Sequence, residues 1–155
     1  MKAPERIQPK SLADYLDVLS KTVFRTGISW RVVDAKWPGT REVFREFDPV
    51  AISHFTGAEL ERLAEDKRII RNRRKIEAIV SNARRMLELD KEHGGFRNYL
   101  RSHGGFEVLV KDLRKQFKFL GDMGAYHFLW VVSEEVPSYE EWCALRGVAP
   151  AHSSH

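Results

Sequence analysis

The chain has 155 residues, and its 26 Lys and Arg exceed its 22 Asp and Glu, which gives a formal net charge of +4 at pH 7 and a pI near 9.3. Cys143 is its single cysteine, so the chain forms no internal disulfide and no multi-cysteine zinc cluster, and no apolar run approaches the ~20 residues that span a membrane. This composition predicts one cytoplasmic domain that contacts no membrane, and its basic surplus favours a polyanionic partner.

The N-terminal half shows a helical spacing of apolar residues that a few glycines and prolines interrupt. In chain order, we expect a flexible arm over residues 1–10, a helix from the cap Ser11 to about Thr26, an apolar stretch that Pro38-Gly39 breaks, a short helix with Val43, Phe44 and Phe47, and two helices opened by Asp48-Pro49 and by the capping box Thr56–Glu59.

The C-terminal half continues this pattern. We expect Asn72 to cap the longest helix, about residues 73–92, followed by two shorter helices punctuated by Gly94-Gly95 and Gly104-Gly105, a helix pair around Gly121 and Gly124, a last short helix from Ser138, and a disordered tail over residues 148–155. Because no segment alternates apolar and polar residues with period two, we predict an all-α fold in which residues 11–147 form a single helical domain.

Residues 116–132, QFKFLGDMGAYHFLWVV, carry the most specific local pattern. Gly121 and Gly124 indicate a tight turn, basic residues that include Lys118 precede it, and an apolar helix over 125–132 follows it. A helix that begins at such a turn points free N–H groups outward, which suits a phosphate oxygen. The pattern is typical of a helix–hairpin–helix that grips a DNA backbone, and equally of an ordinary connection between helices with a glycine cap.

Residues 67–75, KRIIRNRRK, hold six basic positions out of nine. Such a run is most often a solvated helix start. Positive charge near a helix N-terminus is nevertheless unfavourable with respect to the macrodipole, which hints at a use. Lys and Arg side chains here could neutralise phosphates and supply sequence-independent affinity for DNA.

Four segments resemble the DNA-3-methyladenine glycosylase I family. The longest is LAEDKRIIRNRRKIEAIVSNAR, which begins at Leu63. The others are GISW (Gly27–Trp30), FREFDPVAIS (Phe44–Ser53) and FKFLG (Phe117–Gly121), in the same order. The resemblance implies an all-helical member of the helix–hairpin–helix glycosylase superfamily that removes alkylated adenine from duplex DNA by hydrolysing the N-glycosidic bond.

The resemblance also implies roles for individual residues. A base inside a duplex has to be extruded into a pocket, where an aromatic face stacks on it. Trp30 matches the family's pocket tryptophan, with Ser29, Thr22 and Tyr15 as expected base-binding neighbours, although core packing is the commoner fate of a residue such as Tyr15. On the DNA side, we expect backbone N–H groups of Gly121, Met123 and Gly124 to bind a phosphate, and side chains of Lys118, Arg71, Arg73 and Arg74 to hold the duplex.

The chain departs from the family where the acid is expected. Thr22 occupies the position of the pocket glutamate, eight residues before Trp30, and threonine carries no negative charge. In the region where the wider superfamily has an aspartate, Glu140 and Glu141 are candidates for a displaced acid, with helix-surface roles the alternative. The catalytic group therefore stays unknown. The family's zinc ligands lack counterparts, so we expect no metal and no cofactor.

Three functions stay open at this level. The first is a monomeric DNA base-excision repair glycosylase of the 3-methyladenine type that acts on double-stranded DNA. The second is a catalytically impaired DNA-binding or damage-recognition module of the same fold, which the missing glutamate favours. The third is a helical protein–protein adaptor, which would show no affinity for DNA even at low salt.

Overall fold

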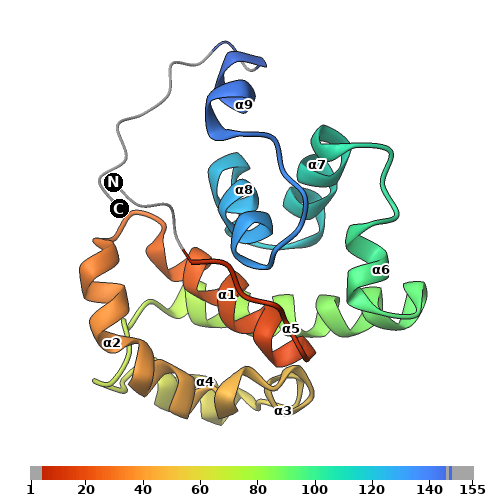
Figure 1. The fold of residues 1–155 in the computed structure, drawn as a ribbon. Coiled ribbons are helices and arrows are strands. Elements are labelled where there is room, and N and C mark those ends of the chain that lie inside the picture. The colour runs from red at the N-terminus through yellow and green to blue at the C-terminus, as the bar shows by residue number, and fades with distance from the viewer. Residues whose placement is uncertain (1–4, 146, 148–155) are drawn as a thin grey trace.

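The computed structural model describes residues 5–145 and 147 and confirms the all-α prediction, because no strand occurs within those residues. Its helices in chain order are α1 (Leu12–Arg25), α2 (Trp30–Val43), the 3₁₀ turn η1 (Arg45–Phe47), α3 (Pro49–Ser53), α4 (Gly57–Leu63), α5 (Arg73–His93), α6 (Phe96–Leu100), α7 (Phe106–Gln116), α8 (Asp122–Val131) and α9 (Tyr139–Leu145) (Figure 1). No helix of this described part is long and apolar enough to cross a membrane.

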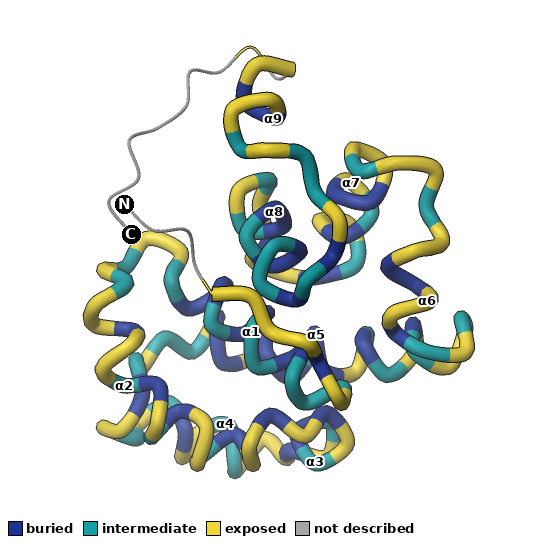
Figure 2. The backbone as a smooth tube through the Cα atoms, in the orientation of Figure 1, coloured by how far each residue is buried: buried dark blue, intermediate teal, exposed yellow. Residues whose placement is uncertain are grey.

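Helix α5 runs through the middle of the molecule, with α1 in front of it, α3 and α4 below it and α6 at its C-terminal end (Figure 1). Its inward face is apolar, and Ile76, Ile79, Ala83 and Met86 are fully buried. The two central helices are buried where they face each other, whereas α2 and α9 expose much of their length (Figure 2). Burial of this stripe, rather than helix propensity, holds α5 in place.

Local capping signals set several helix starts as predicted. The Ser11 side chain accepts from Asp14 N, Asp48 accepts from Val50 N with Pro49 at the first helical position, and Asn72 accepts from Lys75 N. The capping box of Thr56 and Glu59 is formed in both directions. Each cap satisfies a backbone N–H that the helix itself leaves unpaired.

The predicted break at Pro38-Gly39 is wrong, because α2 continues through both residues to Val43. Pro38 is exposed, so the backbone bond that it removes lies on the solvent side, and buried Val33 and Trp37 anchor the helix on its inner side. Gly39 lets another chain segment come close, since a Cβ there would lie 3.1 Å from the Arg68 carbonyl oxygen.

The short helix expected around Val43, Phe44 and Phe47 is also absent. Val43 ends α2, and Arg45, Glu46 and Phe47 form a 3₁₀ turn with left-handed φ angles of 56°, 55° and 58°. Such angles are costly for non-glycine residues. The turn buries Phe47 completely and stacks its ring on Phe44, with centroids 5.5 Å apart, which offsets that cost.

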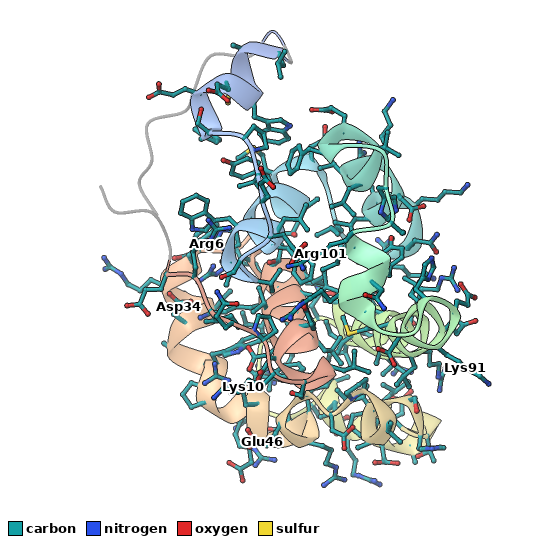
Figure 3. The ribbon with its side chains drawn as sticks, turned by 45° about the vertical axis from the view of Figure 1, so that its right-hand side comes forward. Arg6, Lys10, Asp34, Glu46, Lys91 and Arg101 are labelled. Atoms are coloured by element: carbon teal, nitrogen blue, oxygen red, sulfur yellow. The ribbon has the colours of Figure 1, made fainter. Side chains whose placement is uncertain are left out.

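The described part of the N-terminal arm lies along the end of α8. Ile7 N donates to Val131 O at 2.7 Å, Ser133 Oγ donates to Ile7 O at 2.6 Å, and Arg6 Nε donates to Trp130 O at 2.8 Å. Arg6 therefore points toward this helix rather than into solvent (Figure 3). The predicted tail over residues 148–155 lies outside the described residues.

Candidate active site and nucleic-acid interface

Trp30 is the first residue of α2 and lies where α1, α2 and α8 meet. Its indole is half-buried, with the ring of His127 on α8 edge-on at 5.2 Å between centroids. The guanidinium carbon of Arg25, the last residue of α1, stands over the ring 4.1 Å from its centroid. Ser29 precedes Trp30 as the N-cap of α2 and is exposed. Trp30 therefore lies against α8, the helix that begins at the glycine turn.

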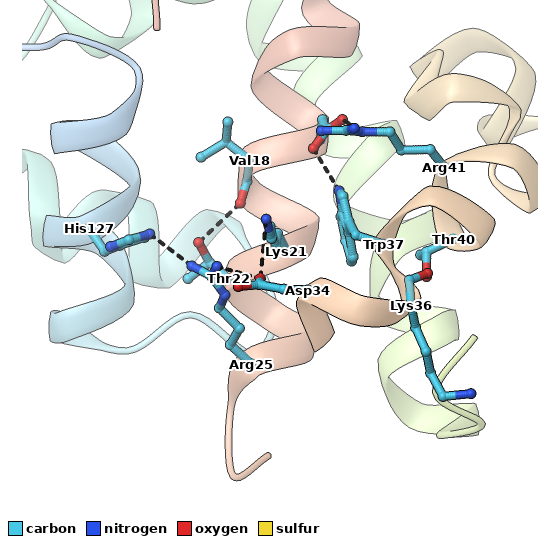
Figure 4. A network of polar contacts seen from close by, with 11 residues as sticks. Val18, Lys21, Thr22, Arg25, Asp34, Lys36, Trp37, Thr40, Arg41 and His127 are labelled. Carbon is cyan, nitrogen blue, oxygen red and sulfur yellow. Dashed lines mark hydrogen bonds and ion pairs between the residues drawn. The ribbon is translucent and has the colours of Figure 1, made fainter. Parts of the chain in front are cut away.

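Arg25 is held in a network of polar contacts between α1, α2 and α8 (Figure 4). Its Nη2 donates to Asp34 Oδ1 at 2.7 Å, and its Nη1 lies 3.3 Å from His127 Nε2. Lys21 Nζ lies 3.2 Å from the same Asp34 oxygen. Only 12% of the Arg25 side chain is exposed, which removes most of the water that would screen its charge.

Asp34 is the carboxylate of this network and stays ionised. Burial by itself raises the pKa of the Asp34 carboxyl, but the hydrogen bonds and charges of Arg25 and Lys21 together hold that pKa below its usual range. One carboxylate thus binds two cationic groups, of which the Arg25 guanidinium also lies over Trp30.

Thr22 and Tyr15 lie one and three turns back along α1 from this network. Thr22 is nearly buried, and its Oγ1 donates to Val18 O at 3.0 Å. The Tyr15 ring packs in the core against Phe96, with centroids 5.1 Å apart. The structure thus places Thr22 at the contact between α1 and α8, and Tyr15 in the core role that was its expected alternative.

The glycine turn differs in detail from its prediction. Helix α8 begins at Asp122 rather than at Ala125, with Gly121 as its N-cap. Gly124 therefore lies in the first helical turn, where a Cβ would be 2.9 Å from Thr22 Cγ2. The backbone N–H groups of Asp122, Met123 and Gly124 belong to this first turn, which lacks intrahelical acceptors for them.

Asn82 on α5 fixes the loop that precedes α8. Its Oδ1 accepts from Lys118 N at 2.8 Å, and its Nδ2 donates to Lys118 O at 3.2 Å. Asn82 is buried, so both bonds are shielded from water. The clamp turns Phe119 outward with a φ of 59° and 38% exposure, and Arg74 lies over the Phe119 ring 6.0 Å from its centroid.

The structure divides the basic run 67–75 into two groups. Lys75 is buried and donates to the carbonyl oxygens of Phe24 and Thr26 at the end of α1, and burial lowers its pKa. Arg73 is paired with Glu61 at 2.6 Å and Glu77 at 2.7 Å.

Arg71 and Arg74 form the second group and are exposed, as is Lys118 across the loop. These three side chains contribute to the cationic surface that faces solvent near the hairpin, together with Arg114 and Lys115 in the last turn of α7. We call Arg71, Arg74 and Lys118 the hairpin cations.

The candidate acids Glu140 and Glu141 are exposed on α9, which packs through Trp142 onto Tyr126 with stacked rings 4.8 Å apart. Within the described part of the chain, no three His, Cys, Asp or Glu side chains gather as a metal site would need.

Sequence reasoning missed three residues around these sites. Arg25 contacts both Trp30 and Asp34 across the chain reversal at Gly27, which has a φ of 73°. Asn82 lies in the middle of a helix, where nothing local marks it as a clamp on a loop 36 residues away. The family segment did contain Asn82, so that match was the available signal.

Comparison with known proteins agrees with these features. The family model described as methyladenine glycosylase matches residues 11–118. DNA-3-methyladenine glycosylase 1 of Escherichia coli (strain K12) is 31% identical over 126 residues, covering 68% of this chain and 67% of the relative. DNA-3-methyladenine glycosylase of Haemophilus influenzae is 33% identical over 89 residues, covering 57% and 48%. This chain therefore spans about half the length of the second relative.

Solved structures show the same fold. A crystal structure of 3-methyladenine DNA glycosylase I superposes with a TM-score of 0.71 at 26% identity, covering 81% of each chain. A variant of such an enzyme in complex with 3-methyladenine also gives a TM-score of 0.71 at 26% identity, covering 81% of this chain and 79% of that one. Together with the match to the family model, these likenesses show that the chain belongs to the methyladenine glycosylase family.

Proposed function

We propose that the chain is a DNA base-excision repair glycosylase that hydrolyses the N-glycosidic bond of alkylated adenine, of the 3-methyladenine type, in duplex DNA. The observation that carries the proposal is the position of Trp30. Its half-buried indole lies against α8, the helix that begins at the glycine turn. Family membership supports the proposed reaction, and the position of the indole supports a stacking role for Trp30 next to the proposed DNA-binding hairpin.

The DNA-binding half of the proposal is a helix–hairpin–helix formed by α7, the loop and α8. Hairpin cations would neutralise phosphates, and the free N–H groups at the start of α8 would bind one phosphate directly. Asp122 in that first turn is already paired with Arg114 at 2.8 Å, which reduces its repulsion of a phosphate. Contacts of this kind position the duplex without reading its sequence.

Hydrolysis of the N-glycosidic bond requires that the damaged base first leaves the duplex stack. Extrusion costs a few kcal/mol, and stacking on an aromatic face returns ~1–3 kcal/mol. Adenine methylated at N3 carries a positive charge as a nucleotide and is a good leaving group, so a positioned water could complete the reaction. The Thr22 hydroxyl donates to Val18 O, and Asp34 is a carboxylate bonded to Arg25, whose guanidinium lies over the indole. Glu141 stays a candidate acid on α9.

The test is release of free methylated base from methylated duplex DNA. We expect the wild-type chain to release base above background and Trp30→Ala to lower the rate by about fivefold or more, because the stacking energy is lost. Trp130→Ala is the matched control, since Trp130 is also half-buried beneath an arginine, Arg6, but at the other end of α8. If Trp30→Ala released base at the wild-type rate, a stacking role for Trp30 would be excluded.

A second function is favoured by one specific observation. Arg25 lies over Trp30, and the uncharged Thr22 stands at the position of the family's glutamate, which suits a damage-recognition module that has lost catalysis. Salt-sensitive binding to duplex DNA with no base released would support the module, and absence of binding at low salt would support a protein–protein adaptor. Sedimentation at several concentrations tests the proposed monomer.

A further inference from the structure

The loop between α7 and α8 turns one aromatic side chain toward solvent. Phe119 has a φ of 59°, a left-handed angle that is costly for a residue with a side chain, and 38% of the residue is exposed. Its neighbours Phe117 and Leu120 are buried and anchor the loop on the inside. Glycine would adopt the same angle without strain, so the turn by itself does not require a phenylalanine. The cost of the angle therefore points to a use for the ring.

Cations border the Phe119 ring. The Arg74 guanidinium lies over it, 6.0 Å from its centroid, and Lys118 is the exposed residue that precedes it. The start of α8 follows, where Gly121 is the N-cap and Met123 in the first turn is 49% exposed. An apolar centre with a cationic border matches the backbone of a nucleic acid, in which deoxyribose carbons lie between successive phosphates. An apolar protein surface fits poorly, because it would desolvate the cations without pairing them.

We propose that Phe119 packs against the deoxyribose of the DNA strand whose phosphate binds at the start of α8. This inference rests on the proposed function, since it assumes that the hairpin holds duplex DNA. It goes beyond that function by adding an apolar contact, which is independent of salt, to a surface that otherwise binds through charge.

The Asn82 clamp makes such a contact effective. Its two hydrogen bonds to the backbone of Lys118 fix the residue directly before Phe119, and Asn82 is itself buried. The ring is thus held outward before DNA arrives, so that binding loses little conformational entropy. An ordered ring that contacts a sugar contributes affinity through the release of water rather than of counterions. The two kinds of contribution can therefore be measured separately.

The experiment measures affinity for a labelled, unmodified duplex by fluorescence anisotropy over a range of salt concentrations. We expect Phe119→Ala to raise the dissociation constant about fivefold at every salt concentration, because the contact that buries the ring is lost. The slope of log K against log salt should stay unchanged, because an apolar contact neutralises no phosphate. Phe119→Leu keeps an apolar side chain and should raise the dissociation constant only about twofold.

Two comparisons separate the ring from its surroundings. Phe119→Gly removes the ring and also relieves the left-handed angle, so its urea midpoint should be no lower than that of Phe119→Ala, while its affinity for DNA falls equally. Val108→Ala is the matched control, because Val108 is an apolar residue with 53% exposure in the first turn of α7, at the end away from the loop. This substitution should leave the affinity for DNA unchanged.

The salt slope also distinguishes a direct contact from an effect on Arg74. If the ring only held Arg74 in place, Phe119→Ala would act as Arg74→Ala does and make the slope shallower by about 0.9. A direct contact instead shifts the whole line by a constant factor, which persists on extrapolation to about 1 M salt, where counterion release contributes nothing.

The outcomes distinguish this inference from the function on which it rests. An unchanged dissociation constant in Phe119→Ala, or a shallower slope with no loss of affinity at the extrapolated salt concentration, overturns the inference and leaves the glycosylase proposal standing. If the wild-type chain binds no duplex at low salt and releases no base, both proposals fail.

Discussion

Gly124 is a residue whose role depends on its neighbour across a helix contact. A Cβ at this position would lie 2.9 Å from Thr22 Cγ2 and 3.1 Å from Leu120 Cδ1. The Thr22 methyl belongs to a β-branched side chain that is nearly buried, so it has little freedom to move away. The glycine that the sequence marked as a turn residue is therefore needed for close packing of α1 on α8.

We predict that Gly124→Ala lowers the free energy of unfolding by about 1–2 kcal/mol. Overpacking costs roughly 1–3 kcal/mol, and the better helix propensity of alanine returns at most about 1 kcal/mol. The measurement is urea unfolding followed by circular dichroism.

Two further variants verify that reason. Gly121→Ser also adds a Cβ, but nothing lies within 4 Å of it and serine is a good N-cap, so stability should hold. Thr22→Ser removes the methyl that collides, and a double-mutant cycle with Gly124→Ala should show a favourable coupling of about 1 kcal/mol. Simple additivity of the two substitutions would contradict the proposed contact.

At the scale of elements, the buried Asn82 connects α5 to the loop before α8. Its two hydrogen bonds satisfy both backbone groups of Lys118 and hold the outward turn at Phe119. A loop held in this way presents the hairpin cations and the start of α8 as one rigid surface. Ordering of that surface before DNA arrives lowers the entropy that binding has to overcome.

Asn82→Ala should therefore weaken both stability and DNA affinity. Loss of the buried partner leaves two backbone groups unpaired, which costs about 1–3 kcal/mol of unfolding free energy. We expect a several-fold rise in the dissociation constant for duplex DNA under conditions where the variant is folded. Asn98→Ala is the control, because Asn98 donates only to the local carbonyls of His93 and Gly94 and should leave DNA affinity unchanged.

The features of individual helices that could be predicted from the sequence are those with local causes. The caps Asp48, Thr56 and Asn72 act within three residues of themselves, so their side chains and spacing were sufficient. The continuation of α2 through Pro38 was missed because its buried inner face, formed against other helices, outweighs one lost hydrogen bond. Lys75 was read as part of a DNA-facing run because its acceptors, Phe24 O and Thr26 O, are about fifty residues away.

In the candidate site, too, features with a local sequence pattern could be predicted, whereas features set by tertiary packing could not. Trp30 was recognised from a family segment and the glycine turn from its local pattern, and the structure places Trp30 against α8, which begins at that turn. The charges around Trp30 could not be predicted, because Arg25, Asp34 and His127 converge from three helices. Tertiary packing alone decides which of the many charged side chains reach the indole.

For the molecule as a whole, the small net charge of +4 matters less than where its unpaired cations lie. Most exposed arginines in the described part of the chain are bonded to carboxylates or carbonyl oxygens, as Arg68 is to Asp66 and Arg84 to Ser53 O. The hairpin cations are exposed on one side, around the start of α5 and the loop before α8. These cations place positive charge beside the start of α8, where we propose that a DNA backbone docks.

Salt dependence measures how many of these cations meet phosphates. Each phosphate that a protein neutralises contributes about −0.9 to the slope of log K against log salt for duplex DNA. We therefore predict that Arg71→Ala, Arg74→Ala and Lys118→Ala each make the measured slope shallower by about 0.9. Lys91→Ala is the matched control, because Lys91 is exposed at the opposite end of α5 and should leave the slope unchanged (Figure 3).

Arg73 lies in the same basic run, and we expect its substitution to change the salt slope by an intermediate amount. Hydrogen bonds to Glu61 and Glu77 raise the pKa of Arg73 and spend its donors on protein carboxylates, so Arg73→Ala should change the slope by clearly less than Arg74→Ala does. Fluorescence anisotropy of a labelled duplex at several salt concentrations gives the slopes of the wild-type chain and of the five variants. Equal changes for Lys91→Ala and for the hairpin cations would show diffuse attraction over the whole surface and would exclude the hairpin as the docking element.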